Sequence, residues 1–110
     1  MTYHDHSDMQ YLKTIGEGYP DGFKAFARFD EAALRGKNKE LSRKTTELIA
    51  LAVGLTTQCV YCIEAHVAAA KEEGATLEEI SEVTLITAAL RAGGGMTHGA
   101  LAVKLFTQDD

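Results

Sequence analysis

The chain of 110 residues carries a formal net charge of −5 at pH 7, and 45% of its residues are hydrophobic. This length predicts a single domain over residues 1–110 with a modest core. The negative charge argues against nucleic acid or an anionic membrane surface as a partner, and no apolar run approaches the roughly 20 residues that span a bilayer. Because the N-terminus is polar and unlike a signal peptide, we expect a cytoplasmic protein with a flexible tail at residues 1–8.

The sequence lacks alternating β-branched segments and hairpin turns, which predicts an all-α fold of about six helices. In chain order, we expect helices near residues 8–16, 20–34, 42–55, 59–74, 76–92 and 96–106. Ser42 is an N-cap residue type for the third helix, and Gly74 suits the end of the fourth. Thr76 and Glu79 have the spacing of a capping box. Gly93–Gly95 is expected to separate the last two helices.

The third expected helix is apolar around most of its circumference, which predicts a central position or a subunit contact. A basic cluster lies just before it and at its start, formed by Arg35, Lys37, Lys39, Arg43 and Lys44. We interpret this cluster as a solvated connector and helix start. Docking of an acidic partner is the alternative interpretation.

The fourth expected helix opens with the two cysteines of the chain, Cys59 and Cys62. On the first turn of a helix, this spacing places both sulfur atoms on one side, close enough to form a disulfide. Unpaired N–H groups and the helix dipole favour a thiolate there, and the thiolate is the species that attacks peroxides and disulfides. In the expected compartment, a close cysteine pair is more often catalytic or metal-binding than structural.

Two further residues extend this pair. His66 follows Cys62 by four residues and shares its helix face, so its imidazole could take the Cys62 proton directly or through one water. Glu47 lies 12 residues before Cys59, and it would reach the histidine or the thiols if the two helices pack antiparallel. The helix dipole favours Cys59 as the reactive thiol, whereas the spacing from His66 favours Cys62. We follow the spacing and assign the attack to Cys62.

Two other classes of function compete with thiol redox chemistry. A zinc-binding module would use Cys59, Cys62, His66 and His98, although thiols and a histidine within two turns do not by themselves make a tetrahedral site. A non-catalytic oligomeric helical protein would carry thiols of ordinary reactivity. We expect neither a metal nor a cofactor. His98 could instead support the redox pocket, although a structural or exposed role is the favoured interpretation. Tyr61, between the cysteines, could also support the pocket, but we expect it to serve in packing.

The motif formed by Glu47, Cys59-Val60-Tyr61-Cys62 and His66 resembles the core motif of the AhpD-like proteins, in the carboxymuconolactone decarboxylase-like superfamily. The flanking segments LSRKTTELIALAVGL and AAAKEEGATLEEISEV are similar too, and the resemblance covers residues 19–106. It implies an all-helical fold that assembles into trimers or hexamers through helical faces. One position departs from the motif. The best-known relatives carry a histidine directly before the second cysteine, where this chain has Tyr61, a poor base near neutral pH.

The resemblance also implies alkylhydroperoxidase or disulfide reductase activity. Cys62 is similar to the peroxide-attacking thiol and Cys59 to the resolving thiol, while His66 and Glu47 match proton-relay positions. The implied partners are a hydroperoxide substrate and a dithiol reductant, such as a lipoyl or thioredoxin-like protein. A carboxymuconolactone decarboxylase-like enzyme is the alternative. That branch does not depend on a cysteine pair, so the pair in this chain favours redox chemistry.

Overall fold

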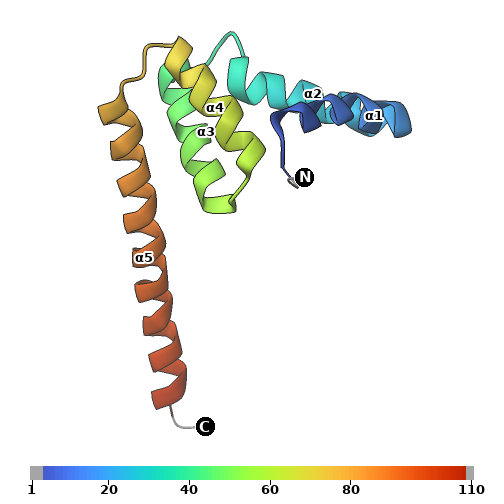
Figure 1. Ribbon diagram of the computed structural model, residues 1–110. Helices are drawn as coiled ribbons and strands as arrows, with labels where there is room; N and C mark the ends of the chain where they lie inside the picture. The colour runs from blue at the N-terminus through green and yellow to red at the C-terminus, as the bar shows by residue number, and fades with distance from the viewer. Residues whose placement is uncertain (1–3, 109–110) are drawn as a thin grey trace.

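The computed structural model describes residues 4–108, which form five α-helices and one short 3-10 helix without any strand (Figure 1). The predicted all-α fold is therefore confirmed for this part of the chain. The elements in order are η1 (His6–Gln10), α1 (Tyr11–Gly18), α2 (Pro20–Arg35), α3 (Arg43–Thr57), α4 (Val60–Glu72) and α5 (Leu77–Thr107). The first three residues of the predicted flexible tail, and the last two residues of the chain, lie outside the described residues.

The helix boundaries follow the capping residues of the sequence. The Ser42 side chain accepts a hydrogen bond from the backbone N–H of Thr45 at the start of α3. At the start of α5, Thr76 and Glu79 form the predicted capping box. Gly74 follows α4 with a φ of +88°, a conformation that strains residues with a Cβ atom. The predicted boundaries at these three places are confirmed.

Two predicted boundaries were wrong. The glycine triplet Gly93–Gly95 does not end a helix, because α5 runs through it without interruption to Thr107. A glycine in a helix costs about 1 kcal/mol relative to alanine, so it weakens a helix without stopping it. The first helical segment also begins earlier than Asp8. It starts with η1, where the Asp5 carboxylate accepts a hydrogen bond from the Ser7 backbone N–H.

The helices are arranged around the antiparallel pair α3 and α4. Helices α2 and α5 also contact α3, which confirms its predicted central position. In Figure 1, the α1–α2 hairpin extends to one side of this pair, and α5 runs away from it on the other side. The described chain measures 55 × 41 × 38 Å with a radius of gyration of 18.4 Å, well above the roughly 13 Å of a compact domain of this length. None of its described helices has the combined length and hydropathy of a membrane span.

The capping box of α5 also joins this helix to α3 through a charge pair. Lys44 Nζ lies 2.9 Å from Glu79 Oε2, and the Thr76 backbone N–H donates to Glu79 Oε1 at 2.9 Å. The Lys44 ammonium and then the Thr76 N–H hold the pKa of Glu79 below its ordinary value. Because the pKa of Glu79 is lower in the folded state, its ionised carboxylate stabilises the fold at pH values above the unfolded-state pKa. This contribution is lost as the pH falls through the folded-state pKa.

We therefore expect Glu79→Gln to lower the melting temperature at neutral pH, because glutamine can still accept from Thr76 but carries no charge for Lys44. The difference from the wild type should shrink as the pH falls below the ordinary glutamate pKa of about 4.3. Thermal unfolding of both proteins, followed by circular dichroism at several pH values, measures this difference in melting temperature. A difference that stays constant with pH would show that the charge of Glu79 is not what stabilises the junction.

Candidate functional site

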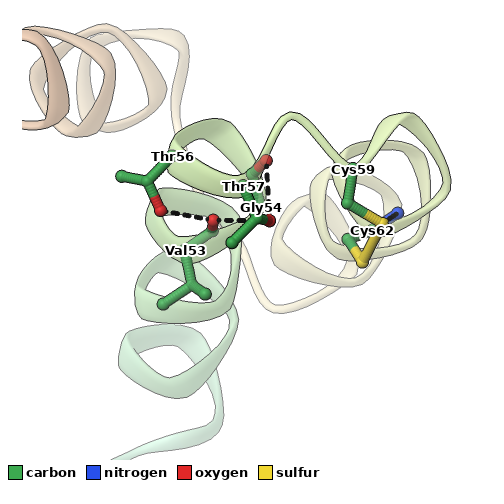
Figure 2. Close-up of a disulfide and its surroundings, with 6 residues drawn as sticks. All are labelled: Val53, Gly54, Thr56, Thr57, Cys59 and Cys62. Atoms are coloured by element: carbon green, nitrogen blue, oxygen red, sulfur yellow. Dashed lines mark hydrogen bonds between the residues drawn. A yellow bond between two sulfur atoms is a disulfide. The ribbon is translucent and has the colours of Figure 1, made fainter.

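The two cysteines lie at the junction of α3 and α4. Helix α3 ends at Thr57, and the left-handed backbone of its C-cap residue Gln58 (φ 56°, ψ 40°) turns the chain back on itself. Cys59 then caps α4, and its sulfur accepts a hydrogen bond from the Cys62 backbone N–H at 3.2 Å. Cys59 and Cys62 form a disulfide across a Cα–Cα distance of 5.2 Å, as Figure 2 shows. The pair thus occupies the N-terminal turn of a helix, where a reduced thiol would be stabilised as a thiolate.

A glycine on α3 allows this turn to pack closely. A Cβ atom added to Gly54 would lie 3.2 Å from Cys62 Cβ, and the Gly54 carbonyl accepts a hydrogen bond from the Cys59 N–H at 3.0 Å. The neighbouring carbonyl of Val53 accepts from the hydroxyls of Thr56 and Thr57 (Figure 2). The end of α3 is therefore held by side chains as well as by the helix itself, and the disulfide rests against it.

The predicted partners Glu47 and His66 meet across the α3–α4 interface. Glu47 Oε2 lies 2.6 Å from His66 Nδ1. The Glu47 side chain is completely buried, and that of His66 is 19% exposed. In the arrangement with an ionised carboxylate and a neutral ring, the ring donates its Nδ1–H to Glu47, and Nε2 carries an unprotonated lone pair. This is the state in which a histidine can accept a proton from a neighbouring thiol.

The second carboxylate oxygen of Glu47 faces a residue of the basic cluster, which the sequence predicted to be a solvated connector and helix start. Arg43, one turn earlier on α3, places a guanidinium nitrogen 3.5 Å from Glu47 Oε1. This oxygen is buried and has no hydrogen-bond partner. The spacing of four residues between an arginine and a glutamate was visible in the sequence, but it is common on solvated helix faces.

A cavity of about 360 Å³ adjoins the site. Cys62 and His66 line it, together with Lys39 and Thr46. Thr46 is 5% exposed, and its buried hydroxyl has no partner. The rest of the wall is mostly apolar and comes from α2, the α2–α3 connector and α3: Ala33, Leu34, Leu41, Ile49, Ala50, Val53, Gly54 and Thr57. Since Cys59 is not among the lining residues, Cys62 is the cysteine that faces this space.

The two predicted supporting residues are not brought to this cavity. The Tyr61 hydroxyl donates to Asp8 Oδ2 at 2.7 Å, and its ring packs edge-on against His4, with 5.8 Å between the ring centroids. The hydrogen bond to Asp8 raises the pKa of Tyr61. His98 is exposed on α5, with its Nδ1 2.9 Å from the Gly94 carbonyl oxygen. Within residues 4–108, no three histidine, cysteine or acidic side chains are grouped as metal ligands.

The fold and the site define an all-α protein in which a disulfide-linked Cys-x-x-Cys turn lies near a buried glutamate that is hydrogen-bonded to a partly buried histidine. The model of the carboxymuconolactone decarboxylase family matches residues 20–105, which contain every residue of this arrangement. The chain belongs to this family.

The chain is also similar to uncharacterized proteins from other organisms. An "uncharacterized protein 4 in cox locus" from Paracoccus denitrificans is 43% identical over 70 residues, which cover 64% of this chain and 63% of that protein. An uncharacterized protein from Haemophilus influenzae is 46% identical over 52 residues, or 47% and 44% of the two chains. The matched part of the chain thus spans less than two-thirds of the length of either relative.

The fold is also similar to a solved structure. The crystal structure of a carboxymuconolactone decarboxylase family protein from Legionella pneumophila, in its apo form, has a TM-score of 0.69 and is 28% identical. The match covers 91% of this chain and 88% of that one.

Proposed function

We propose that the protein is a thiol oxidoreductase that reduces hydroperoxides through Cys59 and Cys62, as an alkylhydroperoxidase does. One observation carries the proposal. Cys62, disulfide-linked to Cys59, lines the same cavity as His66, and His66 Nδ1 is hydrogen-bonded to the buried Glu47. A sulfur atom, a base and an orienting carboxylate are the parts that an activated thiol requires. The mostly apolar wall suits the organic group of an alkyl hydroperoxide.

The reaction begins with the reduced pair. His66 Nε2 accepts the Cys62 proton, and the thiolate attacks the terminal peroxide oxygen. The O–O bond breaks, the alkoxide leaves as the alcohol with the proton from His66, and Cys62 becomes a sulfenic acid. The Cys59 sulfur then attacks the Cys62 sulfur and expels water, which forms the disulfide. A dithiol reductant supplies two electrons and two protons to restore both thiols and is itself oxidised to a disulfide.

The cysteine pair also favours this chemistry over decarboxylation, which gives no role to a disulfide beside the cavity. Thiol titration of the reduced protein tests the proposal. We expect one equivalent of alkyl hydroperoxide per chain to consume both thiols and to release one equivalent of the matching alcohol. We expect dihydrolipoamide or reduced thioredoxin to restore both thiols. Hydroperoxide that leaves both thiols intact would refute peroxidase activity, and so would stoichiometric zinc in protein purified without chelator.

We further propose that the protein is a homo-oligomer, a trimer or hexamer. Among the described residues, Leu51 and Ala70 are the buried hydrophobic side chains, whereas many large apolar side chains are exposed along α1, α2 and α5. Phe106 is 91% exposed and Met96 77%. Exposed apolar surface of this extent marks association sites. Light scattering coupled to size-exclusion chromatography should give a mass three or six times that of the 11.9 kDa chain, and a monomeric mass would contradict the proposal.

A further inference from the structure

Arg43 occupies a position that helix electrostatics does not favour. It is the first residue of α3, and the first turn of this helix contains no acidic residue. The N-terminal end of a helix carries a partial positive charge, so cations are disfavoured there and anions are preferred. A residue that breaks a local rule of this kind often has a compensating role elsewhere in the structure. For Arg43, the compensating partner is the buried carboxylate of Glu47, one turn further along.

The surroundings of Glu47 show what Arg43 contributes. Oε2 is bonded to His66 Nδ1, while Oε1 is buried without a hydrogen bond, so the Arg43 guanidinium at 3.5 Å is the cation that faces it. Burial of a carboxylate favours its neutral form, and a nearby positive charge favours the ionised form. The Arg43 side chain is 43% exposed, so its charge is accessible to solvent while it also faces the buried oxygen.

We propose that Arg43 is a positioning residue whose positive charge keeps a single proton on the Glu47–His66 pair, with Glu47 ionised and His66 protonated on Nδ1 but not on Nε2. Without Arg43, the Glu47–His66 pair would bind one more proton. The extra proton would give either an imidazolium beside a carboxylate or a carboxylic acid that donates to Nδ1 of a ring protonated at Nε2. In both cases Nε2 carries a hydrogen and cannot accept the proton of Cys62.

Other charged or titratable groups near the pair do not replace Arg43. Cys62 and Lys39 line the cavity beside His66, and the Lys39 ammonium donates to the Ala33 carbonyl at 3.0 Å. Lys44 follows Arg43 directly on α3 but pairs with Glu79 on α5. Lys44 therefore offers a matched control, since its removal takes one positive charge from the same helical turn without removing a partner of Glu47.

Nitrogen-15 NMR of the histidine rings tests the proposal near neutral pH, on the disulfide form of the protein. In the wild type, His66 should show a protonated Nδ1 and an unprotonated Nε2. Arg43→Gln should move the Nε2 resonance into the protonated range, whereas Arg43→Lys should restore the wild-type pattern and Lys44→Gln should leave it unchanged. Arg43→Met serves in place of Arg43→Gln if the latter does not fold. An unprotonated Nε2 in the folded Arg43 variants, or an equal change in Lys44→Gln, would overturn the proposal.

The consequence for the thiol rests on the proposed function and is measured separately. With Cys59 replaced by serine, alkylation of Cys62 should be about 10-fold slower or more in Arg43→Gln than with the native arginine, because the thiol lacks its base. Arg43→Lys should recover most of the rate, and an unchanged rate in Arg43→Gln would contradict the link from Arg43 to the thiol. If the NMR pattern is found but hydroperoxide is not reduced by the native protein, the proposed function fails while the role of Arg43 stands.

Discussion

Replacement of Cys62 by serine is expected to abolish hydroperoxide reduction, with a loss of about 10³-fold or more, the scale on which removal of a nucleophile acts. Cys62 lines the cavity with His66, and a serine hydroxyl in its place would not ionise near neutral pH as a thiol can. The remaining cysteine, Cys59, is not among the residues that line this cavity with His66. Hydroperoxide consumption, coupled to a dithiol donor, measures the loss.

Cys59→Ser should behave differently, because it removes the resolving thiol and leaves the attacking one. This variant should consume a single equivalent of hydroperoxide and then stop, with a sulfenic acid on Cys62 that a dimedone probe traps. Mass spectrometry of the labelled peptide identifies the modified cysteine. Sulfenic acid trapped on Cys59 in the Cys62→Ser variant, together with retained peroxide consumption, would reverse the assignment of the two roles.

The sequence predicted those features of the fold that depend on local chemistry. Ser42, Gly74 and the pair Thr76 and Glu79 each satisfy backbone groups at a helix end, and such caps act over a few residues. The meeting of Glu47 with His66 was also predicted, on the condition that two successive helices pack antiparallel. The short connection between α3 and α4 makes that arrangement the natural one.

The features that sequence reasoning missed depend on tertiary packing. The hydrogen bond between Tyr61 and Asp8 joins residues 53 positions apart, and no local pattern indicates it. Arg43 was predicted to belong to a solvated connector and helix start, as one of five residues of a basic cluster. The packing of α4 on α3 buries Glu47, the residue that Arg43 faces. The triplet Gly93–Gly95 was interpreted as a break, although glycine ends a helix chiefly where it adopts a positive φ, as Gly74 does.

Glu47→Gln is expected to have the second-largest effect, a loss of about 10²-fold or more in kcat/KM for hydroperoxide, within the range for general-base contributions. The amide has nearly the same shape as the carboxylate, so the buried site should remain filled. A neutral amide does not stabilise an imidazolium as the carboxylate does. Where the amide NH₂ group faces Nδ1, it donates a hydrogen bond, so Nδ1 must be the acceptor. The hydrogen of the neutral ring then lies on Nε2. His66 then cannot take the Cys62 proton.

Two comparisons separate this electrostatic effect from a loss of structure. Glu64→Gln makes the same change on an exposed position of α4 and should leave the rate unchanged. The double variant Glu47→Gln with His66→Ala should be no slower than His66→Ala alone, since Glu47 acts on the thiol only through the histidine, and residues that act as a unit show non-additive effects. A further loss in the double variant would mean that Glu47 has a role in the reaction that does not pass through His66.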